Sequence, residues 1–172
     1  MLKLQLHDRP ESMVPDLKIA AQAAARGMEV LIIGHLRQKN DTTSPRAGFP
    51  KTDYYADAAD SVSCSSAGPV ARVEVDHPGL AMHYEGGTVY PKKKALAIPV
   101  DPSVAGIWPS EYTGMGNEVF KTKSGNALAD AETGNVLWIL VPKATIPADK
   151  SVLPTDDDIL GAAEEAIWEL VS

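Results

Sequence analysis

The spacing of apolar residues changes along this chain from a helical to a strand period, and that change limits the possible folds more than any other feature. From residue 14 to about residue 39, apolar side chains recur every three or four positions, which is typical of an amphipathic helix. The residues of this stripe are Leu17, Ala20, Ala21, Ala24, Met28, Leu31, Ile32 and His35. Because several of them are alanines, another element can approach the helix closely.

After residues 65–69, which are small and turn-forming, the apolar period becomes two. Residues 70–75 alternate apolar and polar side chains, which predicts a half-buried strand. Further strands are predicted at residues 88–90, 95–100, 118–123 and 136–141, with a turn at residues 130–135 before the last one. Neighbouring strands joined by short turns favour antiparallel pairing.

Two more helices are predicted around these strands. The first is short and covers residues 52–63. The other begins after Thr155, a suitable N-cap, and places Asp156, Asp157 and Asp158 in its first turn, where the helix dipole favours negative charge. The sequence therefore predicts an α+β fold, with a long N-terminal helix and a C-terminal helix packed on a mainly antiparallel β-sheet.

The length of 172 residues predicts a single domain over residues 1–172. Residues 40–51 and 101–117 are rich in turn-forming residues, so we expect a flexible loop at 40–51 and a long loop between strands at 101–117. Long loops of this kind are more often functional than merely connecting.

Composition limits the possible partners and compartments. A net charge of −7 disfavours general binding of nucleic acid, because phosphate backbones are repelled. The single cysteine, Cys64, excludes an internal disulfide and predicts folding in a reducing compartment. The longest apolar run, residues 136–141, is far shorter than the ~20 residues of a membrane helix, so we expect a soluble protein without a membrane partner.

Catalytic and metal-binding interpretations find little support in the residue pattern. None of the four histidines lies at metal-ligand spacing from a cysteine or another histidine. Cys64 could be a nucleophile and His83 with Glu85 an acid–base pair, but a half-buried cysteine and a strand end explain these residues better. We expect no enzyme, no catalytic residue, no metal site and no cofactor, and keep a hydrolase as an alternative that requires Cys64, His83 and Glu85 to converge.

Five residues are candidates for an interface. The basic run Lys92, Lys93 and Lys94 could contact nucleic acid or an acidic partner, or could form a solvated turn that protects strand edges. Trp108 and Tyr112 could be interface anchors, since aromatic residues are enriched at interfaces, or could fold back onto the sheet.

Two glycines and two prolines define a structural turn near the lysines. Gly86 and Gly87 permit a tight turn with positive φ. Pro91 and Pro99 flank the lysines and remove backbone donors, which indicates edge strands. An edge strand is a place where a neighbouring subunit can add a strand.

The segment that contains these residues reads HYEGGTVYPKKKALAIPV over residues 83–100. It resembles the central motif of the phage virion morphogenesis family, which includes tail completion proteins of Mu-like phages and is related to neck proteins of long-tailed phages. Residues 49–62, before the sheet, and the Ile-Pro-Ala step at residues 146–148 resemble the same family. Many relatives continue that step with Arg-Pro-Phe-Leu, whereas this chain has DKSVLP at residues 149–154.

The resemblance implies a structural virion protein of the head–tail interface, which completes the tail and joins it to the head. It implies a cyclic homo-oligomer, with a hexamer as the expected ring, in contact with neck or connector proteins and with the tail tube or terminator. Genomic DNA would pass without sequence-specific binding, and the protein would be made in the host cytoplasm before it joins the virion. The alternatives are a tail terminator that caps the tube, a DNA-contacting assembly factor, or a tail-associated hydrolase.

Overall fold

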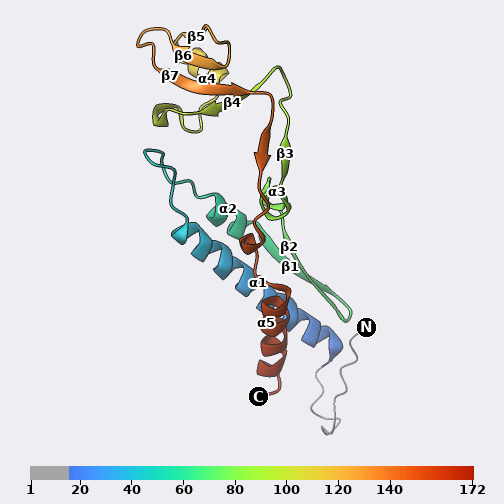
Figure 1. Cartoon of the computed structure of the whole chain (residues 1–172). Helices are drawn as coiled ribbons and strands as arrows, with labels where there is room; N and C mark the ends of the chain where they lie inside the picture. The colour runs from blue at the N-terminus through green and yellow to red at the C-terminus, as the bar shows by residue number, and fades with distance from the viewer. Residues whose placement is uncertain (1–15) are drawn as a thin grey trace. The chain divides into compact units, whose positions relative to one another are not determined.

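The computed structural model describes residues 16–172, so the predicted start of the first helix at residue 14 lies outside the described part. The fold is α+β, as predicted, with an N-terminal helix, a C-terminal helix and antiparallel sheets (Figure 1). The described chain forms two compact units: unit 1 contains residues 16–42, 53–80 and 151–172, and unit 2 contains residues 43–52 and 81–150. The prediction of a single domain stays a prediction, because two compact units can belong to one domain.

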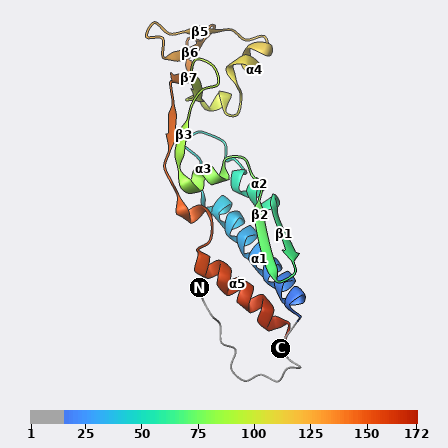
Figure 2. The ribbon, with the colours of Figure 1, turned by 90° about the vertical axis from the view of Figure 1, so that its right-hand side faces the viewer.

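Unit 1 is built on the long helix α1 (Leu17–Thr42). The short helix α2 (Tyr54–Asp60), the hairpin of β1 (Val62–Ala67) and β2 (Val70–Val75), and the last helix α5 (Asp156–Glu169) all pack against it. Figure 2 shows α5 and the two strands alongside α1. A short 3-10 turn, η3 (Lys150–Val152), precedes α5 and ends at the buried Val152.

The hairpin in unit 1 corrects one prediction. Residues 61–63 were expected to end a helix, but α2 stops at Asp60, and β1 begins at Val62 and pairs with β2 over its whole length. The side chains of β1 alternate between half-buried and exposed, in step with those of β2. The sequence of β1, VSCSSA, contains mostly small residues, so it shows no clear alternation of apolar and polar side chains. Pairing with β2 gives the strand its alternating burial.

The crossing of α1 and α5 depends on a glycine. A Cβ added at Gly27 would lie 2.5 Å from the carbonyl oxygen of Ala162 and 2.8 Å from the Cβ of Ala166. The two backbones therefore meet where neither helix has a large side chain, which is the close approach that the alanine-rich stripe predicts. Helix α5 begins at the predicted cap, where Thr155 and Asp158 form a reciprocal capping box.

Unit 2 contains a four-stranded antiparallel sheet and a two-stranded one. The order in the larger sheet is β4 (Leu96–Pro99), β7 (Val136–Val141), β6 (Ala127–Asp130) and β5 (Val119–Lys121). In the smaller sheet, β3 (Gly87–Val89) pairs with β8 (Ala144–Ile146). The prolines predicted an edge position, and β4 with Pro99 is indeed an edge strand.

One face of the four-stranded sheet carries the core of unit 2. Trp138 and Leu137 on β7 pack with Val104, and all three are buried. Val104 comes from the segment of residues 101–117, which connects β4 to β5 and was expected to be a long loop. It does connect the strands, but it also contains the 3-10 turn η2 (Pro102–Val104) and the short helix α4 (Pro109–Gly114), and it packs on the sheet face.

The expected tight turn at Gly86 and Gly87 is the end of a helix. Residues 83–85 were interpreted as a strand end, but they belong to α3 (Leu80–Glu85). Gly86 follows this helix with φ of +75°, and a Cβ there would lie 2.7 Å from the backbone nitrogen of Ala148. Gly87 lies in β3 and has no positive φ, so only Gly86 needs the conformational freedom of glycine.

We predict that Gly27→Ala destabilises unit 1, while Gly34→Ala in the same helix does not. An added methyl at Gly27 forces α1 and α5 apart, at a net cost of about 1–2 kcal/mol after the gain in helix propensity. Nothing lies within 4 Å of a Cβ at Gly34, so that variant should gain up to about 1 kcal/mol. The measurement is the urea midpoint of unfolding, and equal midpoints for the two variants would contradict the close crossing.

We predict a similar contrast between the adjacent glycines of unit 2. Gly86→Ala should cost at least about 2 kcal/mol, because a left-handed conformation and a backbone clash act together. Gly87→Ala places its methyl 3.5 Å from Met82, an ordinary contact, and should change the free energy of unfolding by less than about 0.5 kcal/mol. Thermal unfolding of both variants checks this, and a tolerant Gly86 would show that α3 does not end as described.

Candidate interaction site

The predicted interface lysines lie on a segment that connects the two sheets of unit 2. Lys92, Lys93 and Lys94 are exposed on the segment between β3 and β4, which belong to different sheets. Leu96 pairs with Val141. In the smaller sheet Val89 pairs with Ala144, so both ends of the lysine segment are paired with residues that flank Lys143.

Other lysines join them at this end of the four-stranded sheet. Strand β5 ends at Lys121, and Lys123 lies in the turn that leads into β6. Because β5 and β7 both end here while β4 and β6 both begin here, three separate connections bring their cations together. We call this the basic end; it consists of the exposed residues Lys92, Lys93, Lys94, Lys121, Lys123 and Lys143.

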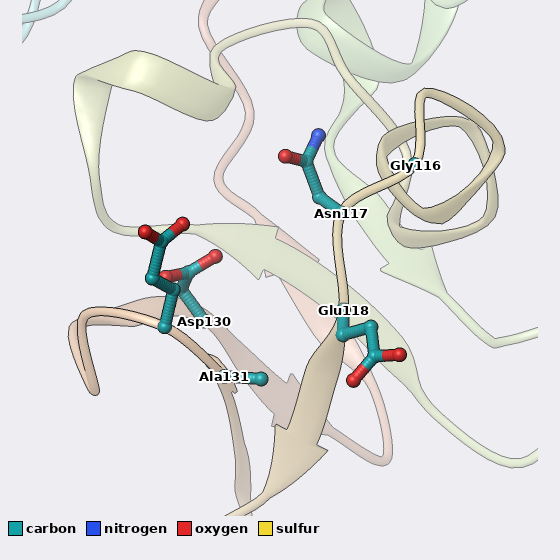
Figure 3. A pocket seen from close by; sticks show the side chains of 6 residues that line it. Gly116, Asn117, Glu118, Asp130 and Ala131 are labelled. Carbon is teal, nitrogen blue, oxygen red and sulfur yellow. The ribbon is translucent and has the colours of Figure 1, made fainter.

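The opposite end of the same sheet is acidic. It contains a depression of about 310 Å³ lined by Gly116, Asn117, Glu118, Asp130, Ala131 and Glu132, and Figure 3 shows the side chains of Asn117, Glu118 and Asp130 around it. Hydrogen bonds from the hydroxyl and backbone amide of Ser103 lower the pKa of Asp101 at the end of β4. We call this the acidic end, defined by the accessible carboxylates Asp101, Glu111, Glu118 and Glu132.

Asp130 lies in the depression but serves the fold. Its carboxylate accepts hydrogen bonds from the backbone amide of Thr133 at 2.7 Å, from the Thr133 hydroxyl at 2.8 Å and from the Tyr112 hydroxyl at 2.9 Å. The bonds from Thr133 and then Tyr112 lower the pKa of Asp130, and the same carboxylate raises the pKa of Tyr112. Asp130 is therefore ionised at neutral pH and joins the turn before β7 to α4.

The structure separates the two aromatic candidates. Tyr112 folds back onto the sheet, with its ring edge-on to Trp138 at 5.4 Å between centroids. Trp108, the N-cap residue of α4, is 66% exposed. Of the two, Trp108 alone has the accessibility that an interface anchor requires.

Large apolar side chains are exposed near both ends of the sheet. Met115, which follows α4 toward the acidic end, is 61% exposed. Near the basic end, Tyr90 precedes the lysine run and is 68% exposed. Phe120 is 48% exposed and pairs with Ala129, which pairs with the first residue of β7, so Phe120 lies level with the acidic end of that strand. These residues give each end an apolar surface beside its charges.

The catalytic candidates are divided between the two units, with Cys64 in unit 1 and His83 and Glu85 in unit 2. The Cys64 thiol donates to a carboxylate oxygen of Glu29 at 3.2 Å, and burial together with this carboxylate raises the pKa of Cys64. A raised pKa keeps the thiol protonated, which is unfavourable for a nucleophile. His83 and Glu85 lie on α3, and their convergence with Cys64 stays a hypothesis.

Within residues 16–172, no group of three or more histidine, cysteine, aspartate or glutamate side chains is placed to hold a metal ion. No helix in the same part of the chain is long and apolar enough to cross a membrane.

The sequence signal for the Asp130 cluster was present but was interpreted only as a turn. An aspartate that opens a turn and is followed by a threonine three residues later is typical of a side chain that accepts backbone hydrogen bonds. The bond to Tyr112 had no local signal, because it joins the turn to α4.

Comparison with known proteins adds no relative. No protein-family model matches the chain, and no curated protein and no solved structure is detectably similar to it.

We predict that Asp130→Asn lowers stability at neutral pH and that this loss shrinks in acid. The folded-state pKa of Asp130 is depressed, so its ionised form stabilises the protein above about pH 4, and the contribution disappears as pH falls through the folded pKa. Urea midpoints at pH 7 and pH 3 measure the difference between wild type and variant.

Glu132→Gln is the matched control, since Glu132 is an exposed neighbour and should show little difference at either pH. Tyr112→Phe removes one of the three bonds and should give a smaller loss of the same sign as Asp130→Asn. A difference between wild type and Asp130→Asn that is independent of pH would contradict the assignment.

Proposed function

We propose that this protein is a structural component of a tailed-phage virion, located at the head–tail junction. It completes the tail and joins it to the head as part of an oligomeric ring. The proposal rests on the resemblance of residues 83–100 and 146–148 to the phage virion morphogenesis family.

One structural observation adds support to the proposal beyond the sequence resemblance. The two segments with the resemblance are in contact: the backbone carbonyl of His83 accepts the amide of Asp149 at 2.8 Å, and β3 pairs with β8. Gly86, near the start of the motif, fits closely against Ala148 in the Ile-Pro-Ala step. This supports the proposal, because two short patterns far apart in the sequence belong to one structural element.

The surface properties suit a ring of repeated subunits around DNA. Strands β4 and β5 are the two edges of the larger sheet and can accept contacts from neighbouring chains. Over its described residues, unit 1 has five Lys and Arg against fourteen Asp and Glu, a net charge of −9. A surface of this charge would repel DNA and let it pass without binding.

The test is deletion of the gene in the phage that encodes this chain. We expect filled heads and tails of normal length that do not join, seen by electron microscopy, with joining restored by the protein supplied from a plasmid. Overlong tails would instead favour the alternative of a tail terminator, because an uncapped tube continues to grow. Normal, joined, infectious particles would refute a role at the junction.

Gold-labelled antibody against the purified protein gives an independent location. We expect label at the head–tail junction of wild-type particles and none on the deletion mutant. Label on neither particle would mean that the protein is absent from the finished virion.

A further inference from the structure

We infer that copies of this chain associate head to tail through the two ends of the four-stranded sheet. The basic end of one copy docks on the acidic end of the next. This inference deepens the proposed ring by naming the surfaces that would join its subunits.

In unit 2 the positive and negative charges are nearly equal in number, but most of them lie at opposite ends of the sheet. Unit 2 has nine Lys and Arg against seven Asp and Glu, a net charge of only +2. Six of the nine cations lie at the basic end. Four of the seven carboxylates form the acidic end, and Asp130 lies with two of them, Glu118 and Glu132, in the depression. The antiparallel order of the strands produces this separation, because alternate connections lie at opposite ends.

The two ends are separated along the sheet by different distances. Strand β7 runs between them and has six residues, which span ~20 Å at the rise of an extended strand, whereas Glu118 and Lys121 at the two ends of β5 are separated by ~10 Å. The screening length at 0.1 M salt is ~10 Å, so along β7 each end presents its own field to the solvent. No salt bridge within residues 16–172 involves a lysine of the basic end.

A second copy fits this pattern better than nucleic acid does. The whole chain carries −7 and unit 1 carries −9 over its described residues, which opposes the approach of a polyanion. The acidic end supplies a compact negative surface on the same sheet, and every copy brings both surfaces. Complementary charge of this kind steers association and fixes its orientation.

Exposed apolar residues would be buried in the contact and would stabilise it. Met115 and Phe120 lie toward the acidic end, Tyr90 precedes the lysines of the basic end, and Trp108 is the exposed N-cap residue of α4. A large apolar side chain surrounded by charged residues is the usual arrangement of a protein interface, with an apolar centre and a polar rim.

Because the two surfaces differ, each docking leaves one free surface of each kind. Such a heterologous contact builds a ring when the rotation between copies closes and an open filament when it does not. It would give a regular assembly without any two-fold contact.

The test uses two charge-reversal variants at exposed positions. The basic-end variant carries Lys92→Glu, Lys93→Glu and Lys94→Glu, and the acidic-end variant carries Glu111→Lys, Glu118→Lys and Glu132→Lys. Sedimentation velocity over a concentration series, at ~50 mM and ~500 mM salt, measures association. Circular dichroism and the urea midpoint confirm that each variant is folded.

We expect wild type to associate at low salt and each variant alone to associate roughly 30-fold or more weakly, because three reversals cancel the net charge of the six-lysine basic end or reverse that of the acidic end. An equimolar mixture of the two variants should recover association, since the unchanged acidic end of the first can dock on the unchanged basic end of the second. Lys39→Glu with Arg37→Glu, on α1 in unit 1, is a control reversal and should leave association intact.

Three results would overturn the inference. They are a wild type that stays monomeric at low salt up to ~1 mM, variants that associate as wild type does, and a mixture that does not recover. Retarded mobility of duplex DNA at ~150 mM salt, lost in the basic-end variant, would assign the lysines to phosphate backbones instead.

This inference and the proposed function can fail separately. Normal particles from the deletion mutant, together with recovery in the mixture, would remove the virion role and leave the docking in place. Unjoined heads and tails, together with unchanged association of the variants, would leave the role and remove the docking.

Discussion

The packing of Trp138 against Val104 and Tyr112 is the interaction on which unit 2 depends. Trp138 lies on β7, a central strand of the four-stranded sheet, and is almost completely buried. The chain between β4 and β5 must cross this face of the sheet, and it does so by placing η2 and α4 on the indole ring. That crossing brings the end of β4 and the start of β5 to the same end of the sheet. The depression and the acidic end follow from it.

The two units use different means to hold their parts together. Unit 1 relies on small residues that let helices approach, with Gly27 at the closest point. Unit 2 is also held together by hydrogen bonds at its turns, including the three that Asp130 accepts. Surface charge follows the same division, since the described part of unit 1 is strongly acidic while unit 2 is nearly neutral overall and polarised along its sheet.

The sequence predicted elements whose signal is local and strong. The helix α1, the alternation in β2, the apolar run of β7 and the cap of α5 at Thr155 are confirmed, although Leu17 of the predicted stripe is 67% exposed and Leu36, outside the stripe, is buried. The missed elements are short or made of small residues: β1 depends on its partner strand, while α3 and α4 have six residues each, too few to show a period. Tertiary contacts, which no local pattern encodes, decide these segments.

The same limit applies to the candidate site. The run of Lys92, Lys93 and Lys94 is visible in the sequence, but its meeting with Lys121, Lys123 and Lys143 depends on strand order and register. Trp108 and Tyr112 looked equivalent, and the packing of Tyr112 on Trp138 separated them. The virion role and the ring remain proposals that rest on resemblance and on surface properties.

The close fit of Gly86 against Ala148 also constrains how sequences of this fold can diverge. A side chain at position 86 would collide with the backbone of residue 148, so a smaller side chain at residue 148 would not relieve the collision; the backbone just after β8 would have to move. Drift at position 86 would thus demand a simultaneous change in the path of the chain around residues 146–148. Substitutions in the two segments should therefore be correlated, because a change in one requires a change in the other.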